Sequence, residues 1–146
     1  METNKQLGYL EQVPFFGVLS LSDKQMLSRH TRLLRFSIGQ TIREKNDLPR
    51  DLYCVVSGEV RIIDERPDGT EISLGLLKDG DSFGWADEDE RPSHAVTYSA
   101  AGEARLLAIS IEKLRELLSS NPGLRQLLAA YMSSSAVAMF LRRTAL

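Results

Sequence analysis

The spacing of apolar residues along the chain changes twice, from helical to strand-like and back to helical. In the first helical region, the apolar residues at roughly helical spacing are Met26, Leu27, Leu33 and Leu34. Ser20, with Asp23 three residues later, approximates a capping box at the start of this region. The pattern predicts a helix of about three turns that passes into extended chain by Phe36.

From Arg35 onward, the chain consists of short runs of strand-forming residues separated by glycines. The runs are residues 41–43, 52–56, 60–63, 72–77, 95–99 and 106–109. Gly39, Gly58 and Gly80 each stand between two runs, and Pro-Asp-Gly at residues 67–69 is typical of a hairpin turn. Such regular spacing predicts an antiparallel roll or barrel.

After Ile109 the helical period returns. Ser110 is a favourable N-cap for a helix that presents one apolar face. That face consists of Ile111, Leu114, Leu117 and Leu118. Asn121 and Pro122 then interrupt the helix and suit the cap and first position of another, which we expect to run to about Arg143.

The last predicted helix carries a stripe at alternating spacings of four and three residues. The stripe consists of Leu124, Leu128, Tyr131, Ser135 and Ala138. It could cover the sheet of its own domain, or pack against the same helix of a second copy in a homodimer. The spacing is compatible with both arrangements.

Length and composition indicate one ordinary globular domain over residues 1–146, with 42% hydrophobic and 26% charged residues. We expect helices over 1–34, the roll over 35–109 and helices over 110–146. The chain shows neither an apolar span nor an export signal, which predicts a cytoplasmic location without membrane contact. A net charge of −2 without a strongly basic segment argues against direct nucleic-acid binding.

The residues offer little for catalysis or metal binding. The single cysteine, Cys54, cannot form an internal disulfide and lies in an apolar run, where a free thiol usually acts as a small buried hydrophobe. His30 and His94 with one cysteine are too few for a zinc site. P-loop, nucleophile-elbow and dinucleotide motifs are absent from the sequence, so we expect neither an enzyme, catalytic residues, nor a metal.

Three motifs in order resemble the cyclic nucleotide-binding domain family, of the catabolite-activator type. They are FSIGQTI at residues 36–42, LYCVVSGEV at 52–60 and GDSFG at 80–84. The resemblance covers nearly the whole chain. It implies a mainly β fold with flanking helices: a double-stranded β-helix, or jelly-roll-like β-roll, with helices at both ends.

The third motif resembles the start of the family's phosphate-binding cassette. The candidate ligand-binding residues are therefore Phe83, Gly84, Trp85, Ala86, His94, Ala95, Val96 and Thr97. In the family, a glutamate accepts from the ribose hydroxyl and an arginine binds the cyclic phosphate. Aligned without a gap, those positions hold Trp85 and His94. Ala95 and Thr97 match the family and support this register.

These two replacements argue against ordinary cyclic-nucleotide binding. Each charge-assisted hydrogen bond is worth roughly 1.5–3 kcal/mol, so losing two weakens binding by about two or more powers of ten. The acidic residues at 87–90 further disfavour an anion beside the cassette. We therefore expect no cofactor, and a cyclic nucleotide is a doubtful ligand.

The resemblance implies a regulatory or docking domain of a larger transporter or signalling protein. Its partners would be a small-molecule ligand, a downstream domain of a longer chain, or a second copy. The cassette and the C-terminal tail are also similar to domains preceding the peptidase and transport parts of bacterial peptide-exporting ABC transporters. Two alternatives remain: a working cyclic-nucleotide sensor of a transcription regulator or channel, and a structural dimerisation module.

Overall fold

The computed structural model describes residues 8, 10, 16–17, 19–45, 47, 50–84 and 96–126. The elements in chain order are α2 (Leu21–Ser28), β1 (Thr31–Phe36), β2 (Thr41–Arg43), β3 (Asp51–Ser57), β4 (Val60–Glu65), β5 (Glu71–Leu77), β6 (Ser82–Phe83), β7 (Thr97–Ala100), β8 (Ala104–Ser110) and α3 (Ile111–Ser119). Residues 122–126 are also helical. None of the helices in these ranges is long and apolar enough to cross a membrane.

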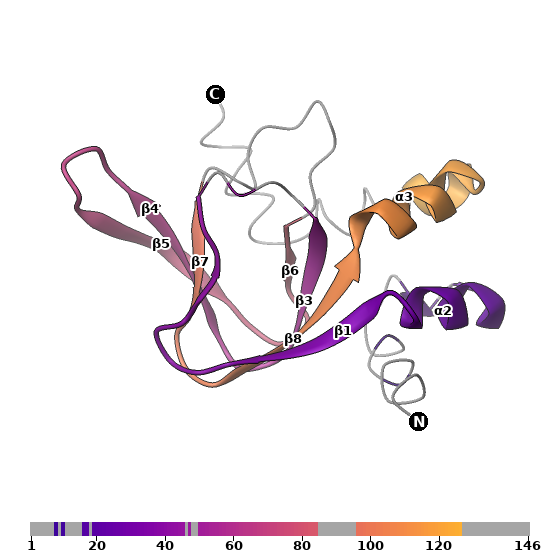
Figure 1. The fold of residues 1–146 in the computed structure, drawn as a ribbon, viewed down its shortest axis with the longest axis horizontal. Coiled ribbons are helices and arrows are strands. Elements are labelled where there is room, and N and C mark those ends of the chain that lie inside the picture. The colour runs from indigo at the N-terminus through magenta and orange to yellow at the C-terminus, as the bar shows by residue number, and fades with distance from the viewer. Residues whose placement is uncertain are drawn as a thin grey trace.

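The strands form two four-stranded antiparallel sheets, in the orders β1-β8-β3-β6 and β2-β7-β4-β5. Helices α2 and α3 lie side by side at one end, and the hairpin of β4 and β5 extends at the other (Figure 1). The mainly β fold with flanking helices is therefore confirmed.

Most of the predicted strands are present. The runs at 41–43, 52–56, 60–63, 72–77 and 106–109 lie within β2, β3, β4, β5 and β8, and β7 begins at Thr97, within the run 95–99. The predicted hairpin turn joins β4 to β5, where Arg66 N–H donates to the Thr70 carbonyl at 2.8 Å. β1 and the two-residue β6 were not predicted, and both pair with strands of the same sheet.

The prediction that the first helix continues through Leu33 and Leu34 is wrong, since α2 ends at Ser28. Its start is as expected, with the Ser20 hydroxyl accepting from Asp23 N–H at 3.1 Å. At its end, the Thr31 hydroxyl donates to the Leu27 carbonyl at 2.7 Å. Residues 31–36 pair continuously with β8. These tertiary hydrogen bonds override the helical spacing of Leu33 and Leu34. The roll thus begins at Thr31, before the expected boundary at residue 35.

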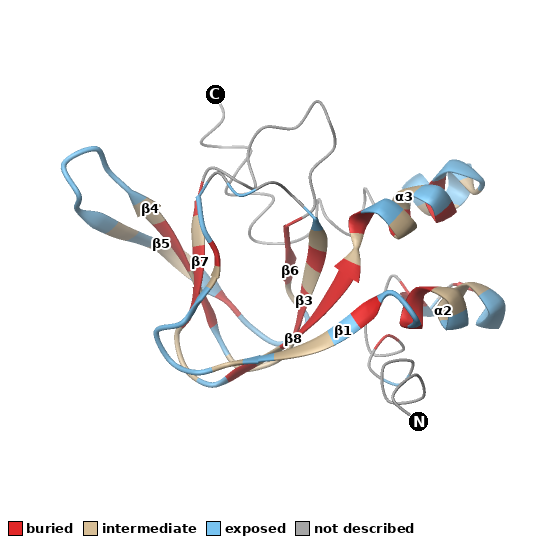
Figure 2. Cartoon of the chain, in the orientation of Figure 1, coloured by how far each residue is buried: buried red, intermediate tan, exposed pale blue. Residues whose placement is uncertain are grey.

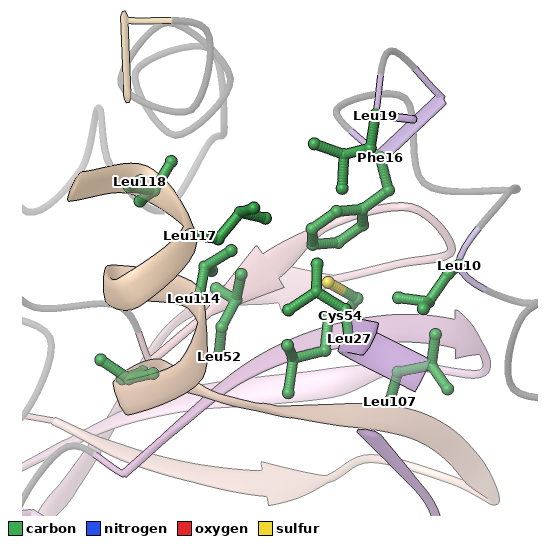
Figure 3. Packing of buried hydrophobic residues seen from close by; sticks show 12 residues of the cluster. Leu10, Phe16, Leu19, Leu27, Leu52, Cys54, Leu107, Leu114, Leu117 and Leu118 are labelled. Carbon is green, nitrogen blue, oxygen red and sulfur yellow. The ribbon is translucent and has the colours of Figure 1, made fainter. Parts of the chain in front are cut away.

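Two hydrophobic cores lie on opposite faces of the sheet that contains β3. One fills the roll, and its buried members are Val55, Val60, Ile62, Leu77, Phe83, Val96, Tyr98 and Leu106. In the other, α3 packs on the outer face over Leu52, Cys54 and Leu107, together with Leu10, Phe16 and Leu19 (Figure 3). β8 lies between β1 and β3 with residues 106–109 all buried (Figure 2), which explains its unbroken apolar run.

The start of the C-terminal helical region agrees with the sequence. The Ser110 hydroxyl accepts from Lys113 N–H at 3.3 Å, and the predicted apolar face of α3 is buried. The Asn121 carbonyl accepts from Arg125 N–H at 3.2 Å at the start of the next helical residues. Leu124 packs against the outer core. The remaining stripe residues, Leu128, Tyr131, Ser135 and Ala138, lie outside the described residues.

The β3–β4 turn supplies a stability prediction. Gly58 has φ +101, and a Cβ there would clash with the Glu103 carbonyl oxygen and lie 2.8 Å from Ala104 Cα. Gly39 also has positive φ, at +84, but nothing lies within 4 Å of an added Cβ. We expect Gly58→Ala to lower the free energy of unfolding by about 3 kcal/mol or more, and Gly39→Ala by about 1 kcal/mol. Urea denaturation measures both, and equal losses would contradict the close backbone approach at Gly58.

Candidate functional site

The two described ends of the predicted cassette lie in different sheets. Phe83 in β6 pairs with Tyr53 of β3, whereas Thr97 in β7 pairs with Ile63 of β4. Val96 is buried in the roll core just before Thr97. Trp85, Ala86, His94 and Ala95 lie outside the described residues. The chain between Phe83 and Thr97 therefore runs from one sheet of the roll to the other.

The turn before the cassette is fixed to β3 by backbone hydrogen bonds. Gly80 N–H donates to the Val55 carbonyl and Val55 N–H donates to the Asp81 carbonyl, both at 2.8 Å. The Asp81 carboxylate accepts from Lys78 N–H at 2.8 Å, which closes the turn. These bonds leave little freedom in where the chain enters β6.

Gly84 brings the cassette backbone into close contact with β3. It has φ +97, and a Cβ at this position would lie 2.6 Å from the Asp51 carbonyl oxygen and 3.1 Å from Tyr53 Cδ2. A side chain at residue 84 would therefore push the backbone away from β3. The glycine is needed for both its conformation and its lack of volume.

Three aromatic rings connect the two sheets next to Gly84. Phe83 stacks on Tyr53 with ring centroids 5.0 Å apart, and on Tyr98 at 4.3 Å. Tyr53 belongs to β3 and Tyr98 to β7, so the Phe83 ring lies between the two sheets. Such aromatic pairs add about 0.5–1.5 kcal/mol each beyond their buried area.

Arg43, at the end of β2, lies beside this stack and was not among the predicted site residues. Its side chain is only 5% exposed. Nη1 donates to the Gly84 carbonyl at 3.3 Å, and Nη2 donates to the Asp47 carbonyl at 2.8 Å. Burial lowers the pKa of Arg43, with the neighbouring Tyr98, Tyr53 and Asp47 acting in the opposite direction. The arginine thus holds the first cassette residues and the loop after β2 together.

Strand alternation could not reveal this inward arginine. In a regular strand, an inward Ile42 would place Arg43 on the outer face. The pairing of β2 with β7 instead shifts register between Thr41 and Arg43, and Arg43 comes to lie opposite Tyr98. Ile42 packs on the roll core and Arg43 is buried as well. The irregularity in the ladder turns a charged side chain inward.

Tyr98 completes the polar lining of the roll interior. The residue is fully buried, and burial raises the pKa of its hydroxyl. Burial also raises the pKa of Tyr53, with the nearby Asp51 in the same direction. Both hydroxyls therefore stay protonated and available as hydrogen-bond donors throughout the physiological range.

An open groove of about 800 Å³ lies outside the roll, beside the first turns of α3. Its lining carries both signs of charge, with Arg32, Arg50 and Arg115 beside Asp51, Glu112 and Glu116. Arg32 and Asp51 form an ion pair at 2.7 Å across it. The groove is open to solvent, and the positive and negative side chains of its lining balance in number.

Comparisons with known proteins identify the fold and the relatives. The family profile described as cyclic nucleotide-binding domain matches residues 33–121, which confirms the resemblance seen in the three motifs. The cyclic AMP receptor protein of Thermus thermophilus is 31% identical over 123 residues, covering 82% of this chain and 56% of that protein. The chain spans about half the length, or less, of the first curated relatives that it matches.

Solved structures show the same architecture. The sensor domain of the transcriptional regulator DNR from Pseudomonas aeruginosa superposes with a TM-score of 0.76 at 23% identity, covering 92% of this chain and 91% of that one. A cAMP-bound mutant regulatory subunit of a cAMP-independent protein kinase A from Trypanosoma brucei superposes with a TM-score of 0.76 at 16% identity, covering 99% of this chain and 52% of that one. These likenesses establish the fold.

Cys54, in the outer core, gives a prediction about reactivity. It is buried, and burial raises the pKa of its thiol from an ordinary value of 9.0 to about 12. We expect a thiol reagent to modify Cys54 in urea but not in the native protein at neutral pH. Fast, complete modification of the native protein would contradict the packing.

The same shift gives a pH dependence with a defined sign. Above pH 9 the unfolded thiol loses its proton while the folded one keeps it, so deprotonation favours unfolding. The contribution of Cys54 to the free energy of unfolding is full below pH 9 and is lost as pH rises toward about 12. Denaturation at several pH values, compared with Cys54→Ala, isolates this contribution from those of the tyrosines.

Proposed function

The chain belongs to the cyclic nucleotide-binding domain family, and we propose that it is a non-catalytic regulatory domain that does not bind cyclic AMP or cyclic GMP in the family's usual way. The observation that carries this proposal is the pair of residues at the ligating positions of the cassette, Trp85 and His94. The register on which it depends is supported by Phe83 and Gly84 on one side and Thr97 on the other.

The two replacements remove different parts of nucleotide recognition. Trp85 cannot accept a hydrogen bond from a ribose hydroxyl, since an indole nitrogen only donates. His94 lacks the planar fork with which a guanidinium binds phosphate, and an imidazole does not carry the permanent charge of arginine. Losing both interactions weakens binding by about two or more powers of ten.

The relatives place the proposal in context without deciding the ligand. The Thermus relative is named a cyclic AMP receptor protein, whereas the Trypanosoma neighbour is described as belonging to a cAMP-independent kinase. The β-roll is thus shared by proteins described in both ways. The ligand of this chain has to be argued from its own residues.

The two cores provide a route from the cassette to the helices. On β3, Tyr53 stacks with Phe83 inside the roll, while Leu52 and Cys54 pack against α3 on the outer face. A shift of the cassette that moves Phe83 therefore acts on the strand that supports α3. We propose that the position of α3 and the residues after it is the output of the domain.

We propose that this output acts on a larger cytoplasmic protein. The sensor part of a transcription regulator is supported by a second relative, named the cAMP-activated global transcriptional regulator Vfr of Pseudomonas aeruginosa, which is 31% identical over 99 residues. The exporter context and the downstream partner stay predictions that the comparisons do not test. Direct nucleic-acid binding is not part of the proposal for this region.

Restoring the two ligating side chains tests the cassette assignment. We expect Trp85→Glu with His94→Arg to bind cyclic AMP about 100-fold or more tightly than the wild type. Isothermal titration calorimetry gives the dissociation constants. The control is Trp85→Gln with His94→Gln, which changes the volume of both positions but adds no charge. Micromolar binding by the wild type, unchanged in the restored variant, would overturn the proposal.

Dimerisation through the predicted stripe is a separate proposal. If the last helix pairs with its copy, Leu128→Glu converts a dimer to a monomer, because it buries a carboxylate in an apolar seam. Gln126→Glu is the matched control, since Gln126 is exposed and off the stripe. Sedimentation velocity distinguishes the two states, and a wild type that stays monomeric at high concentration would reject the dimer.

A further inference from the structure

Arg43 is a buried charge without an acidic partner among the described residues. The ion pairs in that part of the chain join Arg32 to Asp51 and Lys113 to Glu116, and neither includes Arg43. Moving a guanidinium out of water is unfavourable unless an opposite charge compensates it. An apolar side chain would fill the same space in the roll at lower cost, so the charge calls for a functional explanation.

The hydrogen bonds of Arg43 leave donors unused. Nη1 and Nη2 each donate to a neutral backbone carbonyl, of Gly84 and of Asp47. Nε is buried and has no hydrogen-bond partner. The hydroxyl of Tyr98, directly opposite Arg43 in the ladder, is also buried without a partner. Because a guanidinium can only donate, the missing partner is an acceptor.

Asp47 does not neutralise the guanidinium. Its carboxylate lies close enough to act on the pKa of Arg43, but more weakly than Tyr98 and Tyr53. Oδ2 of Asp47 instead accepts from Glu44 N–H at 3.0 Å, within an exposed loop. Asp47 therefore contributes its backbone carbonyl to Arg43 and leaves most of the positive charge uncompensated.

The position of Arg43 relative to the cassette suggests what supplies the acceptor. Nη1 lies 3.3 Å from the carbonyl oxygen of Gly84, the residue directly before Trp85. We infer that Arg43 and Tyr98 form an anion-binding pair inside the roll that binds a phosphate group of the ligand, in place of the arginine that the cassette lacks at residue 94. The inference rests on the proposed function in one respect, that the roll holds a small ligand.

A phosphate fits these donors better than a carboxylate. The free N–H of Nε and the Tyr98 hydroxyl come from two different strands, and each Nη keeps one further N–H. Donors from separate side chains suit the tetrahedral oxygens of a phosphate, whereas a carboxylate is matched by two parallel N–H groups of one fork. A cyclic nucleotide and free phosphate both carry this chemistry.

Arg43→Met tests the pair, because methionine keeps the apolar length of the side chain and removes its charge and donors. The probes are cyclic AMP, inorganic phosphate and, as a neutral control, adenosine, with binding followed by calorimetry and thermal shift. We expect the wild type to bind the two phosphate probes and Arg43→Met to bind them about 10- to 100-fold more weakly. Tyr98→Phe should weaken both by about 3- to 10-fold.

The matched control is Arg61→Met, on β4 of the same sheet, where the arginine is only half-buried. It should leave binding of both probes unchanged. Without ligand, Arg43→Met removes an uncompensated buried charge but also the hydrogen bonds to the Gly84 and Asp47 carbonyls, so phosphate binding and not the melting temperature is the readout that tests the pair. Arg43→Lys keeps the charge without Nε and provides a second variant if the methionine protein does not fold; it should also lose phosphate binding.

Three results would overturn the inference. The first is a wild type that binds neither cyclic AMP nor inorganic phosphate at millimolar concentration. The second is an Arg43→Met protein with a lower melting temperature and unchanged phosphate binding, which would make Arg43 a purely structural link. The third is a strong stability coupling between Arg43→Met and neutralisation of the acids at 87–90, which would identify the counter-charge as the chain's own cassette.

These outcomes are distinct from those of the cassette restoration. If Trp85→Glu with His94→Arg gains no affinity but Arg43→Met still loses phosphate binding, the cassette assignment fails and the Arg43 inference stands. If the restored variant gains affinity for cyclic AMP while Arg43→Met leaves phosphate binding unchanged, the cassette assignment stands and the Arg43 inference fails.

Discussion

The packing of β3 between two hydrophobic cores is the constraint on which the rest of this structure depends. Its alternate side chains enter the roll, where Tyr53 and Val55 lie, or the outer core, where Leu52 and Cys54 meet α3. Pairing with β8 on one side and with β6 on the other fixes its position. A one-residue slip of β3 would exchange the two sets and disrupt both cores, so its register is strongly specified. The cassette entrance and the first C-terminal helix are therefore held by opposite faces of one strand.

Among the described residues, the interior of the roll contains a charged side chain beside a buried hydroxyl. Arg43 and Tyr98 bring a guanidinium and a hydroxyl into a region otherwise built from aromatic and aliphatic side chains. Low polarity around them strengthens any interaction they make and raises the cost of leaving them unpaired. Stability alone does not favour such an arrangement. It is the kind of local conflict with good packing that folded proteins retain where they bind ligands.

The sequence predicts the parts of this fold that follow from local chemistry, and it misses those set by tertiary pairing. The glycine-separated runs, the hairpin turn after β4 and the serine caps of α2 and α3 are all present. Leu33 and Leu34 have helical spacing but lie in β1, because β8 offers that segment a complete ladder. In the candidate site, Phe83, Gly84 and Thr97 were predicted from their motif, whereas Arg43 was not. Its inward direction comes from a register shift that no local pattern encodes.

The motif residues and the ligating residues meet different physical requirements. Gly84 avoids a clash with the Asp51 carbonyl, and Phe83 fills the space between two tyrosines; both are required by the roll itself. The glutamate and arginine of the family's cassette, by contrast, are expected there because they bind the ligand. The residues that identify the family can therefore be those that the fold requires, whether or not the ligating residues are present. For this reason the ligand is better inferred from charges that the fold leaves uncompensated, of which Arg43 is the clearest in the described part of the chain.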